Sequence, residues 1–370
     1  MMIPEPNLTE PRINPMTMAS SNHAIAALLS ITLLTALIGF LAIAAVLPIL
    51  KRIALAHPNA RSSHKVPTPQ GGGIVVAAAA ALVLAGMAML PGQILPGEGA
   101  ASTGPFRHLA ALGAAVSIVV IIGLLDDLHG LSVKLRLAAQ AIAALLVTAT
   151  LPEGIALLPP GGWQVFERVA EAGMLVCFMN ITNFIDGLDE ISVAHAVPAF
   201  GATGIILAGD ALAPWATPLT ALAAGALIGF WPWNRHVARL FLGDSGSLPL
   251  GLLLGYGVLL LLGRGFPAAA VLICLYPLAD GFWTLLRRLL AGKPLSHGHR
   301  EHCYQRATAR GLPVRTVSGS VFLLALALAA LAVLAAHASS PVAAIALVAL
   351  GALLTGAVLR YFAAGFGPRP

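Results

Sequence analysis

The sequence predicts an all-α polytopic integral membrane protein with about 11 transmembrane helices, its N-terminus outside and its C-terminus in the cytoplasm. Of its 370 residues, 58% are hydrophobic and only 10% are charged, whereas a soluble domain carries about 25% charged residues. Apolar runs long enough to cross a bilayer as helices recur along the whole chain. Because lipid offers no partner to an exposed backbone polar group, these runs are expected to be helical.

The expected elements follow in chain order. Residues 1–22 contain Pro, Asn and Ser and are expected to form a flexible tail. The predicted spans are 24–50, 73–91, 107–125, 135–152, 170–186, 190–209, 212–232, 247–263, 266–286, 317–337 and 342–362. The division between the sixth and seventh is the weakest, since only Asp210 and Pro214 interrupt the apolar sequence. No polar stretch is long enough for a second globular domain, so residues 23–370 are expected to form one transmembrane helical domain with cytoplasmic loops.

The orientation follows from the distribution of Lys and Arg between alternate loops. Of the 21 such residues, 17 fall in 51–72, 126–136, 186–190, 233–246, 287–316 and the C-terminal tail. The opposite loops hold only four, at Arg12, Arg107, Arg168 and Arg264. Cytoplasmic loops carry the excess of positive charge, so the first set is predicted to be cytoplasmic. This distribution explains the net charge of +6 without a nucleic-acid partner. The three cysteines are interpreted as free thiols.

Adjacent carboxylates stand where the third span is expected to leave the membrane. Asp126 and Asp127 would repel each other, and a divalent cation would relieve that repulsion. Asp244 lies in the short loop 241–247, just before the next span. It could cap that helix or bind a metal ion.

A second acidic segment ends the fifth span. Asp186 and Asp189 are three residues apart, and Asn180 and Asn183 repeat that spacing one turn earlier. If the helix continues to Asp189, the two acids share one face. If Gly187 breaks the helix, they flank a tight turn instead. Amides and carboxylates at a membrane edge can ligate a hard cation or hydrogen-bond a polar ring.

Two further features have more than one interpretation. The loop Pro67–Gly73 could cradle a phosphate through backbone N–H groups, although glycines are also common where helices begin. Asp280 lies inside the ninth apolar run, where an ionisable residue is expected to be functional unless it pairs with Arg287 or Arg288.

The most basic loop carries a cluster of histidines. His297, His299 and His302, together with Arg300 and Arg306, could form a zinc site or bind an anion. The spacing differs from the metalloprotease HExxH pattern, and Arg300 would lie beside any metal, which favours the anion. Carboxylates for a hard cation opposite such a loop predict a site for a phosphate-rich substrate with Mg²⁺. Because this site lies at the bilayer surface, the second substrate could be a lipid.

In these motifs the chain resembles the polyprenyl-phosphate N-acetylhexosamine-1-phosphate transferases, glycosyltransferase family 4. The matching pieces, in the expected order, are Pro67–Gly73, Gly123–Gly130 with Lys134, Arg136 and Gln140, Asn180–Asp189, Phe241–Ser247, and Asp280 with 299–306. The His-Arg-x-His-x-Tyr-Gln form resembles the O-antigen-initiating branch. One departure is Glu190-Ile191, where the family usually has Gly-Leu. Loss of the glycine removes backbone freedom and adds an acid.

The resemblance implies transfer of a sugar-1-phosphate from a UDP-N-acetylhexosamine to undecaprenyl phosphate, giving a lipid-diphosphate sugar and UMP. This would be the first membrane step of a cell-surface glycan pathway, such as lipopolysaccharide or cell-wall biosynthesis, at the bacterial cytoplasmic (inner) membrane. The implied cofactor is Mg²⁺, with Mn²⁺ as a substitute, and a homodimer is a further expectation.

The resemblance also implies roles for individual residues. Catalysis would involve Asp126, Asp127 and Asp244. Asp244 would be the leading metal ligand, joined by Asp126, Asp127 and Asp186. Nucleotide and sugar would be bound by Asn180, Asn183, Asp186 and Asp189. The diphosphate would be held by His299, Arg300 and His302.

Three rival functions have sequence features that distinguish them. A polytopic transporter with a carboxylate-lined cytoplasmic site would be expected to show repeats and binding groups near the midplane, whereas here the acids gather at one edge. A CDP-alcohol phosphotransferase would need Ala-Arg after an Asp-Gly pair, which Asp186-Gly187 lacks. An intramembrane aspartyl protease would need Gly-x-Gly-Asp, but Phe241 stands in place of the first glycine.

Overall fold

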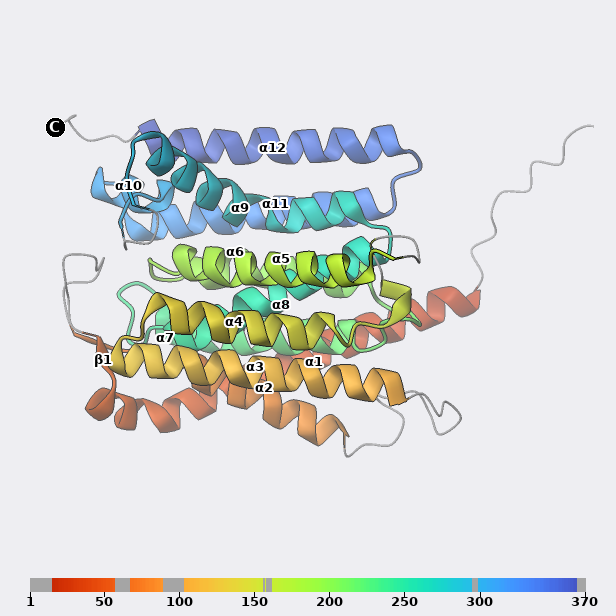
Figure 1. The fold of residues 1–370 in the computed structure, drawn as a ribbon, viewed down its shortest axis with the longest axis horizontal. Coiled ribbons are helices and arrows are strands. Elements are labelled where there is room, and N and C mark those ends of the chain that lie inside the picture. The colour runs from red at the N-terminus through yellow and green to blue at the C-terminus, as the bar shows by residue number, and fades with distance from the viewer. Residues whose placement is uncertain are drawn as a thin grey trace, which may run out of the picture.

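The computed structural model describes residues 15–56, 67–88, 103–155, 157, 162–294 and 299–364, with side chains in the first helix described from Ile25 onward. Helices dominate this part of the chain (Figure 1). Its elements are α1 (Pro15–Ile53), β1 (Leu55–Ala56), β2 (Thr68–Pro69), α2 (Gly72–Ala88), α3 (Thr103–His129), α4 (Val133–Thr148), η1 (Glu153–Ile155), α5 (Gln164–Ile185), α6 (Ile191–Ile206), α7 (Ala216–Asn234), α8 (Asp244–Gly263), α9 (Pro267–Leu290), α10 (Cys303–Ala309), α11 (Val314–Ala336) and α12 (Pro341–Ala364).

The all-helical polytopic class predicted from the sequence is confirmed. Each of the eleven predicted ranges falls on one long helix, and the uncertain division becomes α6 and α7, separated by a turn. Among the described residues, 6 helices are long and apolar enough to cross a membrane by length and composition. The count of eleven spans and their orientation stay predictions.

The helix boundaries differ from the predicted ones mainly at the loops. Helix α1 begins at Pro15, inside the predicted tail 1–22, whose residues 1–14 lie outside the described part of the chain. Helix α3 continues to His129, and α4 begins at Val133, so the predicted loop 126–136 is a tight turn. Gly130 supplies the positive φ of 68° that ends α3. Ser132 then caps α4 by accepting the N–H of Leu135 at 3.4 Å.

The long helices lie side by side along the longest axis of the molecule (Figure 1). Helix α8 is central: it packs against α5, α3, α9 and α2, and most of its length is buried. Helices α1 and α12 are peripheral and expose large apolar side chains, among them Leu33 and Leu353. An apolar outer surface around a buried centre is the arrangement expected of a bundle whose outside faces lipid.

A short strand pair and the backbone hydrogen bonds beside it hold the loop before α8 against the start of α2. Strand β1 pairs antiparallel with β2, and the N–H groups of Gly72 and Gly73 donate to the carbonyls of Phe241 (3.0 Å) and Leu242 (2.9 Å). These donors are therefore engaged within the protein, so the interpretation of Pro67–Gly73 as a phosphate cradle is wrong for these two amides. The loop instead positions the N-terminus of α8.

Candidate active site

The site is built around the N-terminus of α8, which two glycines allow to approach α2 and α3 backbone to backbone. A Cβ on Gly73 would lie 2.2 Å from the backbone of Gly246, and one on Gly123 would lie 2.4 Å from the carbonyl oxygen of Asp244. Both distances are far below van der Waals contact. Any side chain at either glycine would push α8 away from the carboxylates that end α3.

Asp127 caps α8 from the neighbouring helix. Its Oδ1 accepts the backbone N–H of Asp244 at 2.9 Å, and its Oδ2 accepts that of Ser245 at 3.2 Å. The first N–H groups of a helix have no partner within the helix, and a carboxylate there also meets the positive end of the helix dipole. Asp244 itself is the first residue of α8 and makes no side-chain cap, so the capping interpretation of Asp244 is wrong.

Asp126 and Asp244 meet on a single positive group. The Nη1 atom of Arg136 lies 2.7 Å from Asp126 Oδ2 and 3.2 Å from Asp244 Oδ2. Asp126 also accepts the N–H of Leu131 at 2.6 Å through its other oxygen. The two carboxylates come from α3 and α8 and are only 12% and 24% exposed. They therefore converge on one cation-sized position.

Helix α5 supplies the amides on the adjoining face. Asn183 donates to Asp244 Oδ1 at 2.8 Å and to Ser247 Oγ at 2.9 Å, which fixes the orientation of that carboxylate. One turn earlier, Asn180 donates to Gln140 Oε1 of α4 at 2.6 Å. The predicted pair of amides is therefore divided: Asn183 contacts the carboxylate centre, whereas Asn180 links α5 to α4.

Helix α5 ends at Ile185, so the structure selects the tight turn over the continued helix for the acidic segment. Asp186 follows directly and accepts a hydrogen bond from Ser192 Oγ at the start of α6. The pKa of the Asp186 carboxyl is raised to about 8, mainly by burial. The hydrogen bond from Ser192 lowers this pKa, whereas the charges of Asp244, Asp127 and Asp189 raise it. A cation nearby would favour the ionised form of such a group.

Asp189 and Glu190 bind the loop that joins α7 to α8. Asp189 Oδ2 lies 2.7 Å from His236 Nδ1, and Glu190 accepts the N–H of His236 at 3.1 Å and the Nε1–H of Trp231 at 2.8 Å. Glu190 has φ 69°, a conformation that no other non-glycine residue adopts in the described part of the chain. The residue that replaces the family glycine therefore keeps the glycine-like backbone, and its side chain anchors the neighbouring loop.

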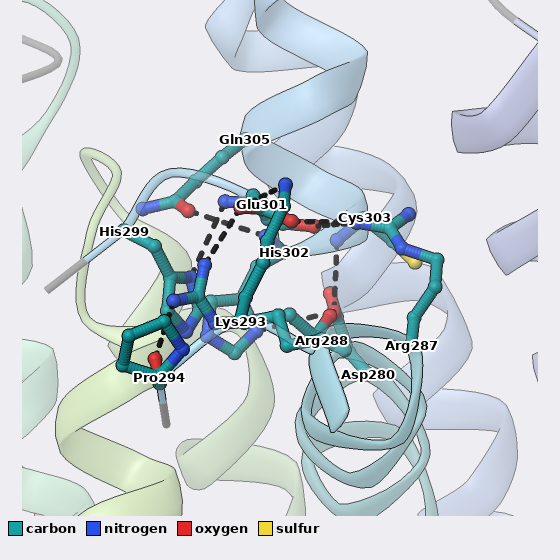
Figure 2. Close-up of polar contacts among 11 residues, drawn as sticks. Asp280, Arg287, Arg288, Lys293, Pro294, His299, Glu301, His302, Cys303 and Gln305 are labelled. Carbon is teal, nitrogen blue, oxygen red and sulfur yellow. Dashed lines mark hydrogen bonds and ion pairs between the residues drawn. The ribbon is translucent and has the colours of Figure 1, made fainter. Parts of the chain in front are cut away.

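The histidine loop reaches this turn through α10. Asp280, fully buried in α9, accepts the N–H of Cys303 at 2.8 Å and lies 3.4 Å from His302 Nδ1 (Figure 2). It pairs with neither Arg287 nor Arg288 in the structure. The interpretation of Asp280 as an arginine partner is therefore wrong, since it stabilises the start of α10 instead.

Tyr304 and His302 connect α10 to the acidic turn. The Tyr304 hydroxyl donates to the Phe184 carbonyl at 2.8 Å, and a Cβ on Gly187 would lie 2.2 Å from that hydroxyl. The His302 ring stacks on those of His299 and Tyr304, with centroids 5.1 and 5.8 Å away. The buried His302 and the partly exposed His299 therefore stand next to the Asp186–Asp189 turn.

Arg300 is exposed beside these rings, whereas His297 lies outside the described residues. Burial, helped by the charges of His302 and Arg288, lowers the pKa of His299 to about 4. His299 is therefore neutral at physiological pH and offers hydrogen bonds rather than charge. Around the described part of the loop, no group of three or more His, Cys, Asp or Glu could hold a metal ion. Because the zinc interpretation includes His297, it is not tested by this search.

The same search finds no such metal-holding group at the carboxylate centre within the described residues. Magnesium, however, is usually held by one or two carboxylates together with substrate phosphates. Asp126 and Asp244 provide two oxygen donors aimed at one position, and Asp186 is close enough for the charges of Asp244 and Asp127 to add to the effect of burial on its pKa. This donor set fits Mg²⁺ bound jointly with a phosphorylated substrate.

Four contact residues were not predicted from the chain as parts of the site. Arg136 belongs to one of the motifs that carry the family resemblance. Its spacing of ten residues from Asp126, across a tight turn, is the one local pattern that indicates their contact. Ser192, His236 and Glu301 come together with their partners only through tertiary contacts. No local pattern marks them.

Comparisons with known proteins identify relatives of this chain. Residues 109–262 match the family model described as Glycosyl transferase family 4. The chain is 31% identical over 289 residues to the decaprenyl-phosphate N-acetylglucosaminephosphotransferase of Mycolicibacterium smegmatis, covering 68% of each chain. The protein of that name from Mycobacterium tuberculosis is 30% identical over 73% of this chain and 72% of its own. A probable undecaprenyl-phosphate N-acetylglucosaminyl 1-phosphate transferase of Bacillus subtilis is 25% identical, covering 78% and 80%.

Proposed function

The chain belongs to the polyprenyl-phosphate N-acetylhexosamine-1-phosphate transferases of glycosyl transferase family 4, and we propose that it transfers a sugar-1-phosphate from a UDP-N-acetylhexosamine to undecaprenyl phosphate. The products would be a lipid-diphosphate-linked sugar and UMP. The observation that carries the catalytic assignment is the convergence of Asp126 and Asp244 on one cation-sized position.

Asp126 and Asp244 would hold Mg²⁺, and Asp186 would add negative charge beside them. When bound, the ion supplies positive charge to the diphosphate and to the departing UMP. Asn183 holds the Asp244 carboxylate in place through its 2.8 Å hydrogen bond. Asp127 acts differently from its neighbour: it fixes the backbone of Asp244 and is a positioning residue in this proposal.

Arg136 is assigned to the anionic substrate groups. Its guanidinium bridges both carboxylates in this structure, and Mg²⁺ bound between them would free it to pair with a substrate phosphate. No general base is required on the chain, because a phosphomonoester is already ionised near neutral pH. The attacking oxygen therefore needs orientation and charge neutralisation rather than deprotonation.

The Asp186–Asp189 turn and the adjacent histidine loop are assigned to the UDP-sugar. Asn180 and Asp189 would bind the nucleotide or sugar, and each is held in place by a hydrogen bond to a neighbouring element. His299, Arg300 and His302 would hold the diphosphate. Stacking fixes the two histidine rings, and Arg300 remains exposed beside them.

The setting of the reaction follows from the predicted topology. We infer a multi-pass protein of the bacterial cytoplasmic membrane whose active site faces the cytoplasm, where soluble UDP-sugars are made. An O-antigen or similar cell-surface glycan would then receive the product. The excess of Lys and Arg in the loops on the same side as the site supports this orientation.

The transfer assay uses the purified full-length protein with Mg²⁺, undecaprenyl phosphate and a panel of UDP-N-acetylhexosamines. UMP release that requires the lipid, with a lipid-diphosphate sugar found by mass spectrometry, is the expected result. A transporter would instead move labelled solute into proteoliposomes without forming UMP. That outcome would overturn the proposal.

A further inference from the structure

Three cations at the end of α9 converge on one carboxylate next to the histidine loop (Figure 2). Glu301 Oε1 lies 2.6 Å from Arg288 Nη1 and 3.0 Å from Lys293 Nζ, and Glu301 Oε2 lies 3.4 Å from Arg287 Nη2. A single negative charge therefore faces three positive ones. Asp280, the other acid labelled in the figure, lies 3.4 Å from His302 Nδ1 and accepts the first amides of α10.

Both guanidinium groups also retain unused donors. Arg288 is only 5% exposed, yet its Nε is buried without a hydrogen-bond partner. The Nη1 atom of Arg287 is likewise buried without one. Buried donors are normally satisfied, and a buried charge is normally paired. The carbonyls of Pro294 and Glu301 also accept from Arg288 and Arg287, yet the cluster still has more positive charge and more N–H groups than these acceptors satisfy.

We propose that Arg287, Arg288 and Lys293 form an anion site for a substrate phosphoryl group, and that the Glu301 carboxylate occupies this site until the ligand displaces it. Carboxylate and phosphate oxygens accept the same forked hydrogen bonds from guanidinium groups. A phosphate carries about −1.5 to −2 charge near neutral pH and so balances the three cations better than Glu301 does. The inference rests on the proposed function, because it takes the anion from that reaction's two phosphorylated substrates.

The position of Glu301 links this site to the proposed diphosphate group. Glu301 lies between Arg300 and His302 in the chain, and its N–H donates to His299 Nδ1 at 3.4 Å. Displacement of the Glu301 side chain would therefore move the segment 299–302, which carries the rings of His299 and His302. The alternative is a purely structural role, in which Glu301 clamps α10 to α9 and no ligand replaces it.

The two roles predict opposite effects of Glu301→Gln on anion binding. The test measures the dissociation constants of UDP and of farnesyl phosphate for the full-length protein in uncharged detergent at low ionic strength. Because Glu301→Gln removes the competing charge, we expect it to tighten binding of one probe at least about fivefold. Tighter binding of UDP would assign the site to the nucleotide diphosphate. Tighter binding of farnesyl phosphate would assign it to the lipid headgroup.

Lys293→Gln is the complementary variant, since Lys293 is 51% exposed and its loss should not disturb folding. We expect it to weaken the same probe about threefold to tenfold, while Lys51→Gln, which removes an exposed cation at the end of α1, changes neither constant. Unchanged or weaker binding of both probes in Glu301→Gln, or unchanged binding in Lys293→Gln, would overturn the inference. The dissociation constants are measured without turnover. Failure of the transfer assay in the wild type would therefore contradict the proposed function and not the anion site.

Discussion

The carboxylate of Asp127 accepts the backbone N–H of Asp244 at 2.9 Å, although 117 positions separate the two residues. The neighbouring Asp126 instead meets the side chain of Asp244 across one nitrogen of Arg136. Two adjacent acids of the same type therefore contact the same residue in different ways. Asp126 acts on its side chain, and Asp127 on its backbone.

This difference predicts separable effects of the two amide substitutions. Asp127→Asn keeps one acceptor oxygen but loses the charge at the helix N-terminus, and it should lower the free energy of unfolding by about 1 kcal/mol. Asp126→Asn should leave thermal stability nearer the wild type and raise the Mg²⁺ concentration needed for half-maximal transfer. Thermal unfolding in detergent and Mg²⁺ titration of UMP release measure the two effects. The same stability loss in both variants, with unchanged Mg²⁺ dependence, would contradict the distinction.

A second prediction concerns Glu190, which has φ 69° where the family usually has glycine. Glu190→Gly relieves backbone strain of about 1 kcal/mol but removes the acceptors of Trp231 and His236, each worth about 1 kcal/mol at this partly exposed position. We expect a net loss of about 1 kcal/mol in stability, with Glu190→Gln in between. Thermal unfolding tests the sign, and a more stable Glu190→Gly variant would show that the anchoring bonds contribute little.

The diphosphate assignment predicts that Arg300 is not replaceable by lysine. A lysine keeps the charge but loses the planar fork that binds two phosphate oxygens. Arg300→Lys should therefore raise the KM for the UDP-sugar about tenfold or more and leave the KM for undecaprenyl phosphate near its wild-type value. Steady-state kinetics with each substrate varied in turn provide the measurement. Unchanged kinetics would remove Arg300 from the site.

The pKa of His299 gives a prediction about pH. Because this pKa is lowered to about 4, the protonated form is already lost at pH values well below 6.5, and raising the pH from 5.5 to 7.5 removes no charge from His299. His299→Asn should therefore lower activity by a similar factor across that range. Profiles of kcat/KM for the variant and the wild type compare the two directly. A gap that opens only at acidic pH would show that His299 acts as a cation.

The sequence was sufficient for the parts of this account that depend on local pattern. Apolar length predicts the helices, and the positions of Asp126, Asp186 and Asp244 at helix ends predict a shared acidic site. The role of Asp127 could not be predicted, because it depends on how closely α8 approaches α3 at Gly123. The same applies to Asp280, whose partners are backbone amides 23 and 24 residues away.

Charge pattern alone was also insufficient in the basic loop. Counting Lys and Arg predicts a cytoplasmic segment, but it does not predict that Glu301 forms ion pairs with Arg288 and Lys293. That contact requires the chain to turn back after α9 and place α10 against it. The predicted helix boundaries differ from the observed ones for a similar reason, since α3 and α9 continue past the ends of their apolar runs.

The most direct test of the central claim, that Asp126 and Asp244 form the catalytic cation position, is the transfer rate of Asp244→Asn. The substitution preserves size and removes the charge that a hard cation needs. UMP release at saturating UDP-sugar and undecaprenyl phosphate should fall at least about a hundredfold, or roughly 2.7 kcal/mol of activation free energy, with unfolding temperature near the wild type. A folded Asp244→Asn enzyme that keeps near-normal turnover at limiting Mg²⁺ would contradict the account.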